Sequence, residues 1–133
     1  MVIVDSSVWI DLLRKRETPE TLAFERLAGE EEIGLGDLML YEVLQGVTPT
    51  DRVEKVKSYL LTFHVFTMGG RDLALEAVHN ANVLRAQGIR VATIDCLIAT
   101  FCLLSGSRLL TSDHHFRPFV DALGLVMADQ TES

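Results

Sequence analysis

The sequence predicts an α/β fold: a three-layer α/β/α domain built on a mostly parallel central sheet of four to five strands. Short apolar runs of strand length alternate with helical segments along the chain, an order typical of a parallel sheet covered on both faces. Hydrophobic residues make up 48% of the chain and the mean hydropathy is +0.24, which supports a substantial core. Its 133 residues are the size of one ordinary domain, so we expect residues 1–133 to form a single domain without repeats or linkers.

The strands are predicted from short apolar runs that turn or charged residues interrupt. The first run, residues 2–4, is β-branched throughout and stops at Asp5, which suits a buried parallel strand. The other strands are expected at residues 33–35, 63–68 and 108–111, and residues 123–127 would form a fifth.

The helices are predicted from apolar residues at helical spacing and from start and stop residues. In chain order they are expected at residues 7–13, 19–29, 37–45, 50–61, 71–87 and 95–105, with a turn or short helix within 113–120. Asp37 and Thr93 are the expected N-terminal caps of their helices. Residues 30–32 are expected to form a solvated turn, and residues 128–133 a frayed tail.

The two cysteines indicate the redox environment. Cys96 and Cys102 lie six residues apart in one expected helix, a rise of about 9 Å, beyond the roughly 7 Å limit between the Cα atoms of a disulfide. We therefore expect two buried free thiols in a reducing compartment. No apolar run approaches the ~18–20 residues of a membrane span, and no basic-then-apolar leader opens the chain. The expectation is a cytoplasmic protein without a membrane partner.

The charge balance bears on the class of partner. The formal net charge is −7, from 12 basic and 19 acidic residues, which by itself argues against a nucleic-acid binder. A site that carries divalent metals brings its own positive charge, and a few arginines can supply the rest. The acidic balance therefore does not exclude a nucleic-acid substrate.

Four acidic residues stand in apolar surroundings where an unpaired carboxylate is costly. They are Asp5, Glu42, Asp95 and Asp113. Asp5 follows the first predicted strand directly and Asp113 follows the fourth after one residue, so both are expected at the carboxyl edge of the sheet, where ligands bind in such folds. Asp95 opens the helix that leads into the fourth strand and can lie at the same edge.

Local ion pairs do not offset these charges. Neither Glu42 nor Asp95 has a lysine or arginine three or four residues away on its predicted helix. Each acid also has a plain structural alternative: Asp95 and Asp113 as helix-start acids, Asp5 as a turn residue, and Glu42 as the partner of a distant arginine. A shared cation accounts for all four at once.

Clustered carboxylate oxygens suit Mg²⁺ or Mn²⁺ better than zinc or copper. Such a centre can activate water and stabilise an in-line displacement at a phosphodiester. The chain has no GxxxxGK[ST] phosphate loop, which excludes nucleotide hydrolysis by that route.

The order of these motifs resembles that of a PIN-domain ribonuclease, most closely the VapC-type toxins of bacterial toxin–antitoxin pairs. MVIVDSSVWID is similar to the family's opening strand, aspartate and Ser/Thr-rich turn, and LMLYEVLQG to its central helix with one glutamate. TIDCLIAT resembles its aspartate-bearing buried helix, and LLTSDHHF its closing strand, threonine, aspartate and downstream phenylalanine. The resemblance covers nearly the whole chain.

This resemblance implies a metal-dependent endoribonuclease that inhibits translation and growth, and that leaves 5′-phosphate and 3′-hydroxyl ends. The implied catalytic and metal-binding residues are Asp5, Glu42, Asp95 and Asp113, with Ser6, Ser7 and Thr111 in support. The implied cofactor is Mg²⁺ or Mn²⁺. The implied partners are an RNA substrate, a second copy in a homodimer, and a cognate VapB-type antitoxin in a hetero-oligomer, whose C-terminal segment fills the active-site groove.

The chain departs from the family pattern at one position. Many relatives carry another acid two residues after the last aspartate, and this chain has His115 there, next to His114. The two histidines either contact RNA or form a polar turn. The basic triplet at residues 14–16 either contacts phosphates near the edge of the first strand or forms a solvated loop. Trp9 is expected to pack in the core or at a dimer interface.

Other functions fit the sequence less well. A phosphatase of the haloacid dehalogenase type needs a second aspartate two residues after the first, where this chain has Ser7. A receiver module needs an acidic pair at the end of the first strand and a late lysine, and neither is present. A catalytically inactive PIN-like scaffold remains an alternative, although acids stand at all four motif positions.

Overall fold

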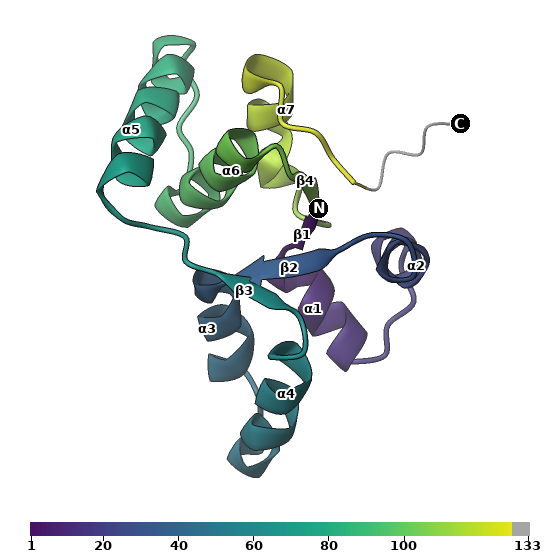
Figure 1. Cartoon of the computed structure of the whole chain (residues 1–133). Helices are drawn as coiled ribbons and strands as arrows, with labels where there is room; N and C mark the ends of the chain where they lie inside the picture. The colour runs from purple at the N-terminus through teal and green to yellow at the C-terminus, as the bar shows by residue number, and fades with distance from the viewer. Residues whose placement is uncertain (129–133) are drawn as a thin grey trace.

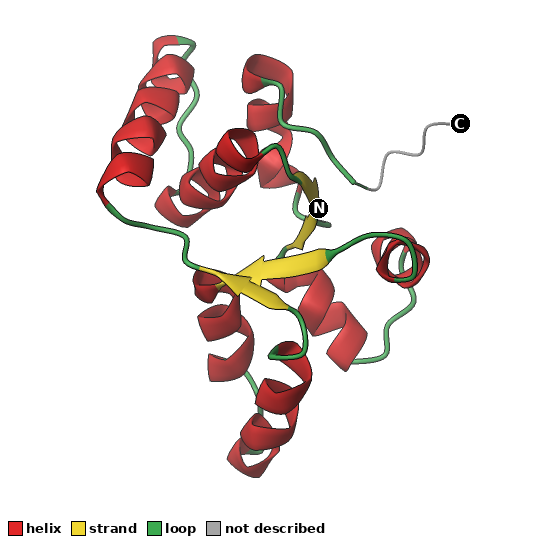
Figure 2. Cartoon of the chain, viewed as in Figure 1, coloured by secondary structure: helices red, strands yellow, loops and turns green. Residues whose placement is uncertain are grey.

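The computed structural model describes residues 1–128 and has alternating strands and helices (Figures 1 and 2). The strands are β1 (Val2–Val4), β2 (Ile33–Gly36), β3 (His64–Phe66) and β4 (Arg108–Leu110). The α-helices are α1 (Ser6–Leu13), α2 (Pro19–Ala28), α3 (Asp37–Gln45), α4 (Val53–Leu60), α5 (Arg71–Ala86), α6 (Thr93–Ser105) and α7 (Arg117–Leu123). Two 3₁₀ turns, η1 (Thr50–Arg52) and η2 (His114–Phe116), precede α4 and α7. None of the helices in this described part has the length and hydropathy to cross a membrane.

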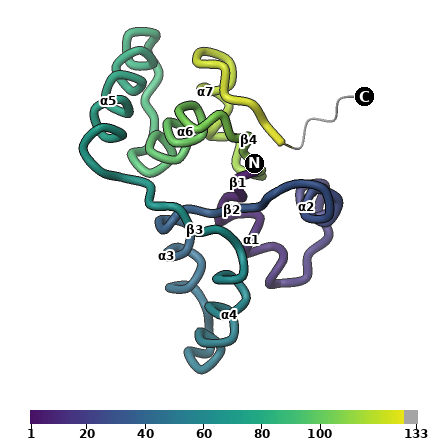
Figure 3. Tube along the Cα trace, in the orientation of Figure 1, coloured from purple at the N-terminus to yellow at the C-terminus, as the bar shows by residue number. Residues whose placement is uncertain are grey.

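The four strands form one sheet in the order β3-β2-β1-β4, and every ladder is parallel. Helices α1, α3 and α4 lie on one side of the sheet and α5, α6 and α7 on the other (Figures 1 and 3). Helices on both faces leave the central strand β1 fully buried. The three-layer fold and the parallel sheet predicted from the sequence are confirmed.

The fifth predicted strand is reduced to a single parallel bridge. Residues 123–127 pair with β4 only at Leu109 and Met127. Helix α7 runs to Leu123 and Gly124 then takes a left-handed conformation, so few residues remain extended beside β4. β3 is also shorter than residues 63–68, because the Phe63 N–H bonds to the Leu60 carbonyl in a turn.

Parallel strands bring the starts of several helices to one edge of the sheet. The chain leaves β1 into α1 at Ser6 and leaves β2 into α3 at Asp37. The Asp5 N–H bonds to the Leu110 carbonyl at 2.9 Å, which joins the ends of β1 and β4. This edge therefore collects polar residues from segments that are far apart in the sequence.

Trp9 anchors the core between α1 and its neighbours. Its side chain is fully buried, and its ring nitrogen donates a 2.9 Å hydrogen bond to the Val4 carbonyl. The ring also lies edge-on or tilted against Phe24, Tyr59 and Phe63. These contacts fix α1, and with it the turn after β1, against α2 and α4. Trp9 is a core residue, as predicted.

Both cysteines are buried free thiols, as predicted. The Cys96 thiol donates a 3.2 Å hydrogen bond to the Ala77 carbonyl, which links α6 to α5. Burial raises the pKa of the Cys102 thiol to about 12, so this thiol stays protonated and unreactive at neutral pH.

The predicted caps differ from the observed ones. Thr93 is the first residue of α6, and Ala92 occupies the cap position without a side-chain bond, so the Thr93 prediction is wrong. Asp37 is likewise the first residue of α3, after Gly36. Its carboxylate accepts the N–H groups of Leu38 and Met68, at 2.9 and 3.0 Å, and so ties the segment after β3 to the start of α3.

Two surface predictions need correction, and one open alternative is narrowed. The basic triplet at 14–16 is exposed beyond the C-terminal end of α1, about 14 Å along the helix from Asp5, which favours the solvated loop over a phosphate contact at the edge. The turn at 30–32 is tied to the sheet, since Glu31 pairs with Arg108 and Glu32 with His64. Of the tail expected to fray, Ala128 is buried and bonds to the Leu109 carbonyl, and residues 129–133 lie outside the described part.

Candidate active site

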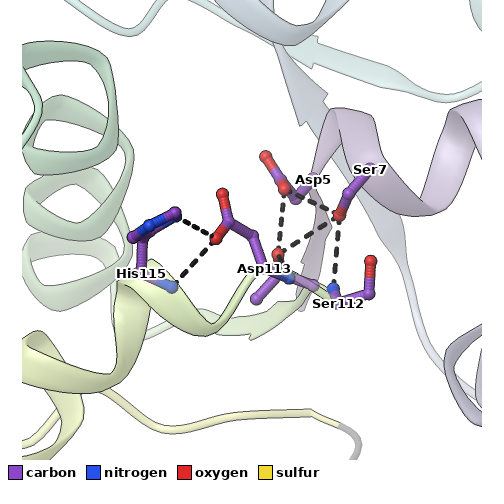
Figure 4. A network of polar contacts seen from close by, with 6 residues as sticks. Asp5, Ser7, Ser112, Asp113 and His115 are labelled. Atoms are coloured by element: carbon purple, nitrogen blue, oxygen red, sulfur yellow. Dashed lines mark hydrogen bonds and ion pairs between the residues drawn. The ribbon is translucent and has the colours of Figure 1, made fainter.

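Asp5 lies at the centre of the polar edge and is 5% exposed. Its Oδ2 atom accepts hydrogen bonds from the hydroxyls of Ser7 and Thr111, each at 2.9 Å (Figure 4). Burial raises the pKa of the Asp5 carboxyl, and the two hydroxyls and the backbone N–H groups of Ser6 and Ser7 oppose that rise. The surroundings therefore hold a buried carboxylate through dipoles rather than through a cation.

The two hydroxyls also set the loop after β4. Ser7 Oγ accepts the Ser112 N–H at 3.2 Å, and Thr111 Oγ1 accepts the Asp113 N–H at 3.0 Å. Each hydroxyl has one proton, and both protons are directed at Asp5, so the 3.3 Å separation between the two oxygens is a close contact. Ser7 and Thr111 thus hold two segments beside the Asp5 carboxylate: the start of α1 and the loop that carries Asp113.

Asp113 lies between Asp5 and His115 in the network (Figure 4). Its Oδ1 atom accepts the His115 N–H at 2.9 Å and stands 2.7 Å from His115 Nδ1. The His115 ring is 71% exposed and stacks on His114, with ring centroids 4.7 Å apart. One oxygen of Asp113 is therefore engaged by both the backbone N–H and the ring of His115.

Glu42 approaches the same edge from the second turn of α3 and is half-buried. Burial raises the pKa of its carboxyl and the negative charge of Asp5 raises it further, while the nearby Ser6 hydroxyl opposes the rise. Glu42 thus lies within electrostatic reach of Asp5 and near the Ser6 hydroxyl at the start of α1.

Asp95 is in the first turn of α6 and is half-buried. Burial raises the pKa of its carboxyl to about 6, helped by the negative charges of Asp113, Asp5 and Glu42, while His115 lowers it. The charges of Asp5, Glu42 and Asp113 therefore all act on the Asp95 carboxyl, although the four residues come from the end of β1, α3, α6 and the loop after β4.

Lysine and arginine side chains of the described part of the chain do not neutralise these carboxylates. Within residues 1–128, no lysine or arginine forms an ion pair with Asp5, Glu42 or Asp95, and the partner of Asp113 is the exposed His115. The alternative that Glu42 pairs with a distant arginine is thereby wrong.

Carboxylates of this kind fit a divalent cation, because hard oxygen ligands and unbalanced negative charge are what Mg²⁺ and Mn²⁺ require. In the described part of the chain, no three acidic, histidine or cysteine side chains already stand at ligating distances. An ion would therefore have to draw the carboxylates together. Relief of their mutual repulsion would favour that movement.

Two residues at this edge were not assigned a position by the sequence analysis. One is His115, whose contact with Asp113 depends on the 3₁₀ turn η2 and therefore could not be predicted from the LLTSDHHF segment alone. Arg117, the first residue of α7, lines a hollow beside Asp113. In the sequence, Arg117 is marked only by its position four residues after Asp113, a candidate metal ligand.

Comparison with known proteins places the fold and the motif order in one family. The chain is 28% identical to "Ribonuclease VapC32" of Mycobacterium tuberculosis over 98% of each chain, and 26% identical to "Ribonuclease VapC19" of the same species over 91% of this chain and 96% of that one. Among solved structures, it is similar to VapBC2 from Rickettsia felis bound to a promoter DNA fragment, with a TM-score of 0.75, 15% identity and coverage of 96% and 97%. It is also similar to VapBC-1 from nontypeable Haemophilus influenzae, with a TM-score of 0.75, 18% identity and coverage of 98% and 100%. The PIN domain family model matches residues 2–120, and the chain therefore belongs to the PIN domain family.

Proposed function

We propose that this protein is a metal-dependent endoribonuclease and the toxin of a type II toxin–antitoxin pair. One observation carries the proposal: the carboxylates of Asp5, Glu42 and Asp113 all act on that of Asp95 in a PIN fold, and within residues 1–128 none of the four pairs with a lysine or arginine. The relatives named as VapC ribonucleases support RNA as the substrate.

Asp5, Glu42, Asp95 and Asp113 would hold Mg²⁺ or Mn²⁺. When bound, such an ion activates water and stabilises the charge that develops on a phosphodiester. The chain itself supplies orientation, since the hydroxyls of Ser7 and Thr111 hold Asp5 in one rotamer and fix the loop before Asp113. The Ser6 hydroxyl lies near Glu42 and lowers the pKa of that carboxyl.

The carboxylates also supply a proton acceptor. Burial and the charges of Asp113, Asp5 and Glu42 raise the pKa of Asp95 to about 6 in the metal-free protein, and a cation bound at this edge would lower it again. An attacking water loses a proton during hydrolysis, and a carboxylate at this edge can accept it. Measurements of Mg²⁺ affinity and of the RNA cleavage rate on variants of each acid would separate the residues that bind the ion from the residue that accepts the proton.

The partners follow from the similarity to toxin–antitoxin complexes. Solved structures with the same fold include VapBC complexes from Rickettsia felis and Haemophilus influenzae. A cognate VapB-type antitoxin, a homodimer and a toxin–antitoxin hetero-oligomer are the assemblies we propose. Free thiols and an RNA substrate suit the cytoplasm.

RNA cleavage in cells tests the proposed function. Controlled expression followed by sequencing of RNA 5′ ends should give new, discrete 5′-phosphate ends and growth arrest with the wild-type chain. Asp5→Asn should abolish both, whereas Asp121→Asn, an exposed aspartate of α7, should retain both. New ends that persist in the Asp5→Asn protein would contradict the assignment of this edge as the active site.

A further inference from the structure

A hollow of about 200 Å³ lies directly beside the acidic edge. Thr111 and Asp113 line it from the acidic side, Ser112 and His114 form its polar wall, and Arg117 and Glu20 also border it. We propose that this hollow binds a phosphate of the RNA strand next to the bond that is cleaved, with Arg117 as the phosphate contact. The inference rests on the proposed ribonuclease function and adds a substrate-binding residue to it.

Charge is the first reason to assign a phosphate to this hollow. The chain carries a formal net charge of −7, and the candidate active site is itself acidic, so the rest of an RNA strand needs cations that the carboxylates do not provide. Arg117 is the basic side chain that lines this hollow. Several other cations are engaged elsewhere, such as Arg16 with Asp11 and Arg108 with Glu31.

The state of the Arg117 side chain is the second reason. It is exposed, and within residues 1–128 it forms no ion pair. A guanidinium presents several N–H donors in a plane and matches two phosphate oxygens at once. Arg117 can therefore take a phosphate without first breaking a contact in the described structure.

The polar lining is the third reason. Ser112 is exposed, its N–H is held by Ser7 Oγ, and the exposed ring of His114 stacks on His115. Hydroxyl groups and arginines are among the groups that contact phosphate and sugar in nucleic-acid complexes. A strand whose scissile phosphate lies at Asp113 would pass its neighbouring phosphate over this hollow.

Glu20 provides a second test, because its neutralisation should change RNA affinity in the opposite direction to that of Arg117. It stands at the start of α2 and borders the same hollow, where its negative charge would repel a phosphate. If Arg117 binds RNA here, Glu20→Gln should tighten binding while Arg117→Gln weakens it. If Arg117 had only a structural role, the Glu20→Gln and Arg117→Gln variants would not be expected to change RNA affinity in opposite directions.

Equilibrium binding of a short fluorescein-labelled single-stranded RNA, followed by anisotropy over a range of salt concentrations, tests the inference. The variants are made in the Asp95→Asn background so that the RNA stays intact, and the wild-type chain is assayed for cleavage in parallel. Arg117→Gln should weaken binding by about tenfold and lower the slope of log affinity against log salt by about 0.7, the value for one phosphate contact on a single strand. Arg117→Lys should keep most of the slope.

Arg85→Gln is the matched control, since Arg85 is an exposed arginine on α5 that bonds to Asn82 and does not line this hollow. Equal affinities and equal slopes for Arg117→Gln and Arg85→Gln, together with wild-type cleavage, would overturn the Arg117 assignment and leave the ribonuclease function standing. A wild-type chain that neither binds nor cleaves RNA would overturn both. Equal melting temperatures for the variants would show that the differences arise at the binding site.

Discussion

The Thr111 hydroxyl donates a 2.9 Å hydrogen bond to the Asp5 carboxylate across a sequence separation of 106 residues. The bond joins the end of β4 to the end of β1 at the edge where the acids meet. Thr111 also accepts the Asp113 N–H, so one buried hydroxyl positions two of the four candidate metal ligands.

Replacement of Thr111 by valine should therefore affect both stability and activity. Thr111→Val removes a hydroxyl from a buried carboxylate and leaves the Asp113 N–H without its acceptor, which should cost about 1–3 kcal/mol of unfolding free energy. RNA cleavage should fall because Asp113 loses its position. Urea denaturation and cleavage assays measure the two effects, and Thr111→Ser, which keeps the hydroxyl, should lie close to wild type. A valine variant as stable and as active as the serine variant would show that the hydroxyl has no positioning role.

The pKa of Asp95 predicts how metal-free stability depends on pH. A carboxyl whose pKa rises from 3.8 in the unfolded chain to about 6 in the folded one binds its proton more tightly when folded. Its contribution to stability therefore falls as pH rises through that interval and stays low above it. Asp95→Asn should remove this loss and stabilise the metal-free protein at neutral pH by roughly 1 kcal/mol, after allowance for solvent screening.

Denaturation of the wild-type and Asp95→Asn proteins at several pH values in EDTA checks this prediction. The difference in unfolding free energy between them should grow from acidic to neutral pH. A difference that shrinks over the same range would mean that Asp95 is stabilised as a carboxylate by a partner, contrary to the like-charge cluster described above.

His115 should limit the cation affinity of the site. His115→Asp removes the contact with Asp113 and adds a negative charge, so the metal-free protein should melt at a lower temperature and Mg²⁺ should raise the melting temperature more than in wild type. His79→Asp makes the same charge change at an exposed position on α5 and serves as the control. Equal Mg²⁺-induced shifts in the two variants would exclude position 115 from the cation site.

A substitution in a buried polar pair away from the candidate site distinguishes a loss of stability from a loss of cation binding. The Asn80 amide donates to the Thr100 hydroxyl at 3.0 Å between α5 and α6, and both side chains are buried. Thr100→Val leaves the amide without this partner and should cost about 1–3 kcal/mol of unfolding free energy. The Mg²⁺-induced rise in melting temperature should stay as in wild type. A smaller rise in this variant would indicate that α6 packing controls the position of Asp95.

The sequence was sufficient to predict a parallel sheet with its four strands and the position of Asp5 and Asp113 beside the ends of two of them. Asp5 and Asp113 follow predicted strands, and parallel strands end at one edge, so their proximity follows from topology alone. The contacts that organise the edge were not predictable, because hydrogen bonds such as Ser7 to Asp5 and Thr111 to Asp5 depend on rotamers and on the register between β1 and β4.

Errors in the prediction arose where tertiary contacts decide between neighbouring residues. Thr93 suits a helix cap by residue type, but Ala92 is the last residue with extended dihedral angles, and no local pattern distinguishes the two positions. Glu31 looks like part of a solvated turn until β4 brings Arg108 beside it, 77 residues further along the chain.

Calorimetric titration of Mn²⁺ tests the central claim that Asp5, Glu42, Asp95 and Asp113 form one cation site. Asp5→Asn, Glu42→Gln, Asp95→Asn and Asp113→Asn are each compared with wild type, and Glu54→Gln, an exposed acid of α4 paired with Lys57, is the control. The account predicts that each of the four weakens binding by about tenfold or more while the control binds like wild type. Wild-type affinity in the Asp5→Asn and Asp95→Asn proteins would contradict it.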